Sequence, residues 1–373
     1  MLGFASVAAA EPEGSQLDPG SYPRTPSPPL GLAGTPAAGA RLEGQRLAGF
    51  VIGPWDVDPT LIGGFANGAD VIDGPEALAA ELPPELAEVV LRHNVIDGFS
   101  TGRKAADKDL RITVLRFPDV PNASAAAAEL GVAAAQRVEP GGPVNPAEVP
   151  GHPDTAAVGY PVVDQDGGES ANVRAFTAYG QYVVVQRAGA VSGVEDATAL
   201  VAATLERQLP LLDQFPATPL MLLPIQPLDP TGLLARSLPV APADVTAELP
   251  GVYDARAALH FQDDPVASAA LFADAGVTNW VNGSVAVYEA RDRDAAQRVV
   301  DEMAATAAEF GTPTDPVAGL PDSRCMTLQL PQDGDVTGYC LAVADRYVLE
   351  TYDATPAESR QKVAAQYAIL THR

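Results

Sequence analysis

The chain has 373 residues, with 48 acidic against 23 basic side chains and a formal net charge of −25. That charge is spread along the chain and repels phosphate backbones and anionic lipid headgroups, so it disfavours binding to nucleic acid and to membrane surfaces. With 47% hydrophobic residues the sequence is globular and long enough for two domains. No apolar stretch approaches the roughly 18 residues of a transmembrane span.

The first ten residues have features of a secretory signal. The apolar run 2–10 ends in the small residues Ala8-Ala9-Ala10 and is followed by acidic Glu11. This matches the hydrophobic region and cleavage site of a signal peptide, but the basic segment that normally precedes them is missing. We interpret residues 1–10 as a signal-peptide remnant, with the true start upstream or misplaced. The alternative is a disordered, alanine-rich N-terminus. The signal predicts an extracytoplasmic protein, secreted or in the cell envelope.

The two cysteines support export, because we expect them to form a disulfide. Cys325 and Cys340 lie in two alternating runs on either side of the turn signal Asp333-Gly334, which predicts a β-hairpin. The midpoint between the cysteines falls in that turn, so their sulfurs should lie opposite each other on adjacent strands. A bond there would contribute on the order of 3 kcal/mol. Reduced core cysteines are the alternative.

The N-terminal part of the chain is rich in proline. This composition predicts an extended segment over residues 11–42. Residues 47–52 are a candidate for a short strand, and the spacing of apolar residues predicts a helix over 84–93.

An internal repeat is the most informative feature of the sequence. Each copy contains a strand, a helix, two later strands and a closing helix. In the first copy these are residues 112–117, 122–136, 157–163, 180–185 and 195–209. In the second copy they are residues 284–289, 294–308, 325–330, 345–350 and 357–370. Tyr182 and Tyr347 lie in matching strands, and Tyr182–Val185 is apolar on both faces, which predicts a central strand.

These elements predict an α+β fold of two repeated units, each a small, mostly antiparallel sheet with helices packed on one face. We expect the first unit over residues 43–215 and the second over 216–373, joined by a proline-rich passage between Pro210 and Pro250.

Three motifs resemble an actinobacterial family of secreted envelope proteins and lipoproteins of unknown function. They are Leu17-Asp18-Pro19-Gly20-Ser21-Tyr22-Pro23-Arg24-Thr25-Pro26, Glu43-Gly44-Gln45-Arg46-Leu47-Ala48 and Val57-Asp58-Pro59. The resemblance covers most of the chain and implies an envelope location, with no catalytic residues to transfer. Many members carry a lipobox cysteine after the signal. This chain has none there, so the resemblance does not extend to a lipid anchor.

One motif points to catalysis. Gly98-Phe99-Ser100-Thr101-Gly102 matches the G-x-S-x-G pattern of serine hydrolases, whose nucleophile stands between a strand and a helix. Here a helix is expected before the motif, and a charged loop over 103–109 is expected after it. A turn built from glycine and serine is therefore the preferred interpretation. A secreted hydrolase that uses Ser100 with a remote histidine is the alternative.

The sequence predicts no metal ion and no cofactor. The four histidines are far apart and lack zinc-site spacing, so structural or surface roles are expected for His93, His152, His260 and His372. The acidic loops 164–169 and 333–335 are weak calcium candidates, but neither has the full ligand spacing of a calcium loop. No glycine-rich phosphate loop opens a helix.

These observations favour a non-enzymatic extracytoplasmic protein of the cell envelope that binds an unidentified envelope ligand or protein partner. We expect its site in the groove between the two units, because pockets are common at domain interfaces. No catalytic residue is assigned, and the only covalent site is the Cys325–Cys340 disulfide. A purely structural surface component is a further alternative.

Overall fold

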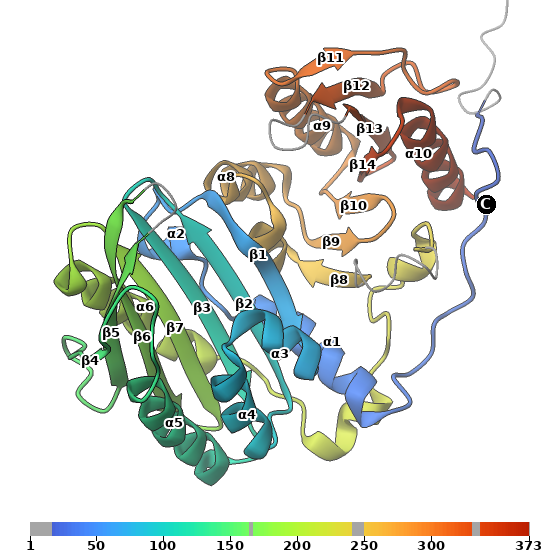
Figure 1. The fold of residues 1–373 in the computed structure, drawn as a ribbon. Helices are drawn as coiled ribbons and strands as arrows, with labels where there is room; N and C mark the ends of the chain where they lie inside the picture. Colours follow the sequence, from blue (N-terminus) through green and yellow to red (C-terminus); the bar gives the residue numbers. More distant parts are fainter. Residues whose placement is uncertain (1–16, 164–166, 241–249, 330–335, 373) are drawn as a thin grey trace, which may run out of the picture. The chain divides into compact units, whose positions relative to one another are not determined.

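The computed structural model describes residues 17–163, 167–240, 250–329 and 336–372, which form two compact units (Figure 1). The first unit comprises Gly31–Leu228 together with Tyr253–Ala270, and the second comprises the chain up to Leu30, Asp229–Val252 and Leu271–Arg373. The segment Tyr253–Ala270 lies in the range that the sequence assigns to the second unit, yet it packs with the first. The domain limits 43–215 and 216–373 stay a prediction.

The first unit contains a seven-stranded antiparallel sheet of order β1-β2-β3-β7-β6-β5-β4. Its strands are β1 (Gly63–Ile72), β2 (Asp97–Lys104), β3 (Lys108–Arg116), β4 (Asn145–Pro146), β5 (Ala156–Val163), β6 (Glu169–Tyr179) and β7 (Tyr182–Ala190). Its helices are α1 (Pro36–Ala48), α2 (Pro54–Val57), α3 (Pro75–Glu81), α4 (Pro84–Arg92), α5 (Val120–Ala135), α6 (Val194–Leu212) and α7 (Ala255–Ala258). The prediction of a central strand at 182–185 is confirmed, because β7 is the middle strand of the sheet.

A second seven-stranded antiparallel sheet has the order β8-β9-β10-β14-β13-β12-β11, which repeats the first order strand for strand. Its strands are β8 (Gly251–Asp254), β9 (Asn279–Asn282), β10 (Ala286–Glu289), β11 (Gly311–Pro313), β12 (Arg324–Gln329), β13 (Val336–Ala344) and β14 (Tyr347–Asp353). The remaining helices are α8 (Pro265–Ala275), α9 (Arg293–Ala307) and α10 (Pro356–Thr371). The α+β class and the two repeated units are thus confirmed.

The repeat extends to the pairing of single residues. Tyr182, the first residue of β7, pairs with Arg116, the last residue of β3. Tyr347, the first residue of β14, pairs with Glu289, the last residue of β10. The two tyrosines therefore occupy equivalent places in equivalent strand pairs.

The hairpins that lead into these two strands also match. The loop between β6 and β7 begins with Gly180, and the loop between β13 and β14 begins with Asp345. Both residues have a φ of 55°. This left-handed conformation is easy for glycine and is tolerated by aspartate, so both units make the same tight turn with different residues.

The helices that follow β3 and β10 begin with the same cap. The side chain of Asp119 accepts a hydrogen bond from Asn122 N (2.9 Å), and that of Asp292 accepts one from Ala295 N (2.8 Å). Both caps lie slightly upstream of the helix starts that the sequence predicts, Asn122 and Asp294. An aspartate at this position satisfies a backbone N–H group that has no partner within the helix.

Helix α1 corrects two expectations. It begins at Pro36, within the segment expected to be extended, and its last residues overlap the short strand expected over 47–52. Thr35 caps it by accepting a hydrogen bond from Ala38 N, and a proline at the first helical position suits the backbone there. These local signals begin a helix at Pro36, although the proline-rich composition of the segment predicts an extended chain.

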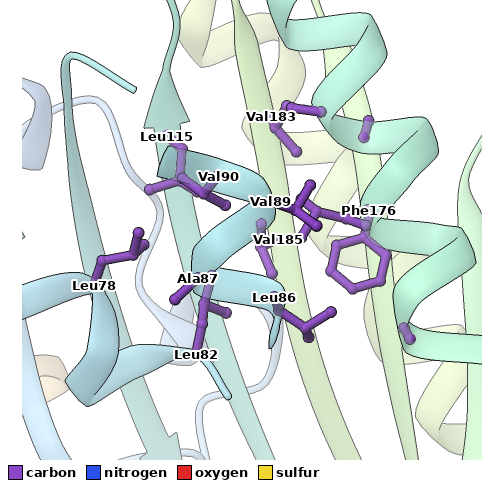
Figure 2. Close-up of a cluster of buried hydrophobic side chains, with 14 of the residues drawn as sticks. Leu78, Leu82, Leu86, Ala87, Val89, Val90, Leu115, Phe176, Val183 and Val185 are labelled. Atoms are coloured by element: carbon purple, nitrogen blue, oxygen red, sulfur yellow. The ribbon is translucent and has the colours of Figure 1, made fainter. Parts of the chain in front are cut away.

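Helices cover both faces of the first sheet. Leu86, Val89 and Val90 of α4 pack with α5 against Phe176, Val183 and Val185 on one face (Figure 2). Helix α6 lies on the opposite face, where Gln186 Nε2 donates to Val201 O. The sequence predicts helices on one face, and α6 adds a second layer on the other.

The predicted disulfide between Cys325 and Cys340 is present. The two residues pair directly across β12 and β13, with their Cα atoms 4.1 Å apart. The turn at Asp333-Gly334 lies outside the described residues, as does the signal-like segment 1–10. Among the residues that are described, no helix is long and apolar enough to cross a bilayer.

Candidate functional site

Three arginines lie next to one another across the middle of the first sheet. Arg111 on β3 pairs with Arg187 on β7, and Arg187 pairs with Arg174 on β6. Cross-strand partners point to the same face of a sheet, so the three side chains form one row, here called the arginine row. Like charges directly opposite each other destabilise a sheet, so surrounding groups must stabilise this row.

Glu81, the last residue of α3, holds the Arg111 end of the row. Its Oε2 accepts hydrogen bonds from Arg111 Nη1 and from Ser100 Oγ, the second at 2.6 Å. Ser100 Oγ also lies 2.9 Å from Thr113 Oγ1. The Glu81 and Arg111 side chains are both buried, so water screens their attraction little. The other carboxylate oxygen, Glu81 Oε1, is buried and has no hydrogen-bond partner in the described part of the chain.

Polar groups beside the row orient the other two arginines. Arg174 Nη1 donates to Glu139 Oε1 (3.0 Å), and Arg187 Nε donates to Asn172 Oδ1 (3.1 Å). Arg187 Nη2 lies 3.3 Å from Asp109 Oδ1. Each guanidinium is therefore fixed by contacts that use only part of its five N–H donors.

The two carboxylates that hold these arginines titrate differently. Burial by itself would raise the pKa of Glu139, but hydrogen bonds from Arg137 and Arg174 outweigh it and lower that pKa. Burial raises the pKa of Asp109, and the charges of Arg187 and Arg111 only partly oppose that shift. The two carboxylates therefore differ in the direction of their pKa shifts, because hydrogen bonds from two arginines dominate at Glu139 and burial dominates at Asp109.

The edge strand β1 bulges next to the arginine row. Its register against β2 shifts between Gly64 and Ala69, so Phe65 and the residues after it have only Gly102 opposite them on β2. A bulge re-aims side chains that would otherwise follow the ladder. Here it frees Phe65 to lie over the neighbouring strands.

Phe65 packs between two of the arginines. The guanidinium carbons of Arg111 and Arg187 lie 5.0 Å and 5.2 Å from the centre of its ring, which is cation–π distance. A Cβ atom at Gly102 would lie 2.9 Å from Phe65 Cδ1 and 3.0 Å from Arg111 Nη2. The absence of a side chain at Gly102 therefore permits this stack.

These residues line a pocket of about 390 Å³ within the first unit. Residues 79–84, which comprise the end of α3, the two-residue connection after it and the first residue of α4, form one wall. Strands β3, β6 and β7 contribute the arginine row, Thr113 and Val185. The lining includes three guanidiniums and one carboxylate, that of Glu81. The volume lies within the roughly 300–1,000 Å³ typical of small-molecule sites.

Ser100 does not form the turn that the sequence predicts. It lies inside β2, which runs from Asp97 to Lys104 and pairs in continuous register with β3. Its side chain is fully buried, hydrogen-bonded to Glu81 and Thr113, and absent from the pocket lining. The strand-to-helix bend of a nucleophile elbow is missing, so the geometry gives the hydrolase alternative no support.

His260 contacts β2, but it lies on the face of the strand opposite to the Ser100 side chain. Its Nδ1 lies 3.1 Å from Thr101 Oγ1, and successive strand residues point to opposite faces. Its Nε2 lies 3.1 Å from the carbonyl oxygens of Ala48 and Val51, so Nε2 carries the proton and Nδ1 accepts. Burial lowers its pKa to about 3. His260 is a neutral structural residue that anchors the segment Tyr253–Ala270.

The other histidines lie elsewhere. His93 follows α4, and its Nε2 lies 3.1 Å from Oε2 of Glu129 on α5. His152 is in a turn, and His372 follows α10. In the described ranges, no three histidine, cysteine or acidic side chains gather as a metal site would require. The calcium candidates fall largely on residues 164–166 and 330–335, outside those ranges.

A second buried charged cluster lies at one end of β2. Arg116 Nη1 is 3.2 Å from Glu43 Oε1 and 3.6 Å from Asp97 Oδ2. Neither oxygen of Asp97 has a hydrogen-bond partner among the described residues. Burial raises the pKa of Asp97 to about 8, because Arg116 compensates it incompletely and Glu43 adds a second negative charge. Asp97 is therefore largely protonated at neutral pH.

The arginine row was not apparent in the sequence. Arg111, Arg174 and Arg187 are isolated basic residues within strands whose neighbours are mostly apolar. The available signal was a long charged side chain in each of the three central strands, β3, β7 and β6. That signal becomes specific only when the registers of β3, β7 and β6 are known.

Two family models match this chain. One, described as the N-terminal part of a domain of unknown function (DUF7373), matches residues 30–228, and its C-terminal counterpart matches residues 233–373. None of the curated proteins matches. Among solved structures, the extracellular domain of PknH from Mycobacterium tuberculosis is similar over 44% of this chain and 94% of that chain, at 13% identity and a TM-score of 0.31. A likeness this distant supports no conclusion about function.

Proposed function

Because this chain belongs to the DUF7373 family, which has no assigned function, we propose a role from its own residues. The protein is a non-enzymatic, extracytoplasmic protein of the actinobacterial cell envelope that holds a small ligand in the pocket over the arginine row. The observation that carries this proposal is a row of three arginines lining a pocket in a chain whose net charge is −25.

The proposed location rests on the N-terminal segment and on the disulfide. The apolar run before Glu11 has the character of a signal peptide, and the Cys325–Cys340 bond is of a kind that persists in oxidising compartments outside the cytoplasm. The motif beginning at Leu17 resembles actinobacterial envelope proteins, which supports the same location.

A binding role is supported over catalysis by how the polar groups at the pocket are used. The Ser100 hydroxyl is buried and engaged by Glu81 and Thr113, and His260 contacts the opposite face of β2. A nucleophile needs a base that can take its proton, whereas Glu81 is paired with Arg111. The ligand site between the two units that the sequence analysis predicts stays a separate prediction from this pocket.

The proposal is tested by native mass spectrometry of the full chain after incubation with the small-molecule fraction of an envelope extract. Ala80 is exposed and lines the pocket, so Ala80→Trp should fill the pocket without disturbing the core. Ala128, exposed on α5 and outside the lining, provides the matched control Ala128→Trp.

We expect a bound small molecule on the wild type and on Ala128→Trp, and its loss on Ala80→Trp. The proposal is contradicted if no bound mass appears, or if Ala80→Trp retains it as the wild type does.

A further inference from the structure

The charge in the pocket favours a ligand with a negative group. Three guanidiniums line it against one carboxylate, while the acidic partners Glu139 and Asp109 lie outside the lining. The side chain of Arg187, the middle member, is 39% exposed and so remains accessible. Repulsion between adjacent guanidiniums destabilises the sheet, and an anion bound to the row would reduce that repulsion.

The arginines have the donors for a carboxylate. Nη1 of Arg187 and Nη2 of Arg174 take no part in the contacts with Asn172, Asp109 and Glu139 described above. A planar guanidinium matches the two oxygens of a carboxylate and binds them with charge-assisted hydrogen bonds. Because these two arginines are directly opposite on β7 and β6, one ligand group can contact both.

Glu81 adds a different requirement. Glu81 lines the pocket, and its Oε1 is buried and has no hydrogen-bond partner among the described residues. A buried acceptor without a donor destabilises the protein, so a ligand that donates a hydrogen bond there is favoured. The negative charge of Glu81 also repels a phosphate group, which carries up to about two negative charges, more than it repels a carboxylate.

Resting on the pocket proposed above, we infer that the ligand is a small carboxylic acid that also bears a hydroxyl or amino group. Its carboxylate binds Arg187 and Arg174, and its hydroxyl or ammonium donates to Glu81 Oε1. The volume of about 390 Å³ suits a molecule the size of an amino acid or a monosaccharide acid. Leu82 and Val185 provide apolar contact for its carbon chain.

The inference is tested by isothermal titration of the full chain with five probes. Gluconate and L-glutamate carry both a carboxylate and a donor, and they separate the hydroxy-acid from the amino-acid form of the ligand. Hexanoate carries the carboxylate alone, glucose carries donors alone, and glucose 6-phosphate replaces the carboxylate with a phosphate. We expect gluconate or L-glutamate to bind at least about ten-fold more tightly than the last three, a difference of about 1.4 kcal/mol.

Two variants assign the interactions. Arg187→Gln should weaken the preferred acid by at least about ten-fold. Arg298→Gln, on α9, is the matched control, because Arg298 forms an exposed pair with Asp274 and should leave binding unchanged. Glu81→Gln should abolish the preference over hexanoate while retaining carboxylate binding. If Glu81→Gln fails to fold, Arg187→Lys, which keeps the charge but loses the planar fork, should still weaken the preferred acid.

The outcomes distinguish failure of the inferred ligand class from failure of the proposed pocket. Tightest binding of glucose 6-phosphate, equal binding of glucose, or no binding of any probe at millimolar concentration overturns the inferred ligand class. In those cases an extract-derived ligand that Ala80→Trp displaces would leave the proposed function standing. If a probe binds and neither Ala80→Trp nor Arg187→Gln weakens it, the pocket itself is wrong.

Discussion

The two units have different side chains at equivalent points of their two sheets. In the first unit Arg174 on β6 pairs with Arg187 on β7, whereas in the second unit Tyr339 on β13 pairs with Tyr352 on β14. Both pairs lie at the same distance along their hairpins from the tight turn. The tyrosine rings stack with their centres 4.5 Å apart, where the first unit has guanidiniums beside a pocket.

The tyrosines of the second unit enclose a buried carboxylate. Glu350 accepts hydrogen bonds from the hydroxyls of Tyr288 (2.6 Å), Tyr339 (2.8 Å) and Tyr352 (3.3 Å). Burial, followed by the charge of Glu350, raises the pKa of Tyr339 well above its usual value. The units therefore share strand order and turn geometry, whereas the polar residues on one face of each sheet differ.

The largest expected effect concerns the ion pair that is special to the first unit. Glu81→Ala leaves Arg111 buried without its carboxylate, so the free energy of unfolding of the first unit should fall by about 3–5 kcal/mol. Trp55 lies in the first unit and Trp280 in the second, so urea unfolding followed by fluorescence in a Trp280→Phe background reports on the first unit alone.

Glu85→Ala is the control for this experiment. Glu85 is half exposed in its pair with Arg137, and its loss should cost less than about 1 kcal/mol. Similar losses for Glu81→Ala and Glu85→Ala would mean that the arginine row does not depend on Glu81.

The disulfide is special to the second unit, since the chain has only two cysteines. Replacing Cys325 and Cys340 with alanine reopens a loop of sequence separation 15 and should lower the stability of the second unit by about 3 kcal/mol. Trp280 fluorescence in a Trp55→Phe background should shift to lower urea, while Trp55 in the converse background should not. A shift of both signals would show that the units unfold together.

The third prediction converts a residue of the first unit into its counterpart. Asp97 pairs with Arg116, and at the equivalent place Asn279 pairs with Glu289. The pKa of Asp97 is about 8 when folded and near its usual 3.8 when unfolded, so the folded state binds more protons between those values. The stability of the first unit should therefore fall as pH rises from about 4 to about 8 and level off above.

Asp97→Asn should remove the part of this pH dependence that Asp97 contributes. At pH 8 it should raise the free energy of unfolding of the first unit by about 2 kcal/mol, because no buried carboxylate has to be ionised or kept protonated. Urea unfolding at several pH values, monitored by Trp55, measures both quantities. A variant with the same slope as the wild type would place the pH dependence elsewhere.

The smallest effect is expected at the matched turns. Gly180→Asp and Asp345→Gly each introduce the residue that the other unit already uses at a φ of 55°. Gly180→Asp should cost up to about 1 kcal/mol and Asp345→Gly should gain a similar amount, because only glycine adopts this conformation freely. Gly180→Val, with a branched side chain, should cost clearly more in the same unfolding assay. Equal costs for aspartate and valine would mean that the turns are not equivalent.

Features with a local cause were predictable. The strand containing Tyr182 was recognised as central because both of its faces are apolar, and the cysteines were paired because a turn signal lies midway between them. The internal repeat could be recognised because both copies contain the same order of predicted strands and helices.

Features that depend on distant partners were not predictable. The charge of residues 103–109 predicts a loop, yet residues 103–104 end β2 and residues 108–109 begin β3, so only residues 105–107 connect the strands. Arg103 is accommodated there because its guanidinium donates to the carbonyl oxygens of His260 and Gln262, more than 150 residues away. No pattern in the sequence around Arg103 predicts that these two carbonyl oxygens are its partners.

The class of fold, the duplication and the disulfide could be predicted from the sequence, because alternation, turn residues and spacing act over a few neighbouring positions. The row of Arg111, Arg174 and Arg187 beside Glu81 is visible only in the folded chain. Their proximity depends on the registers of β3, β7 and β6 and on the packing of α3, and those are settled by burial of the whole face rather than by any one segment.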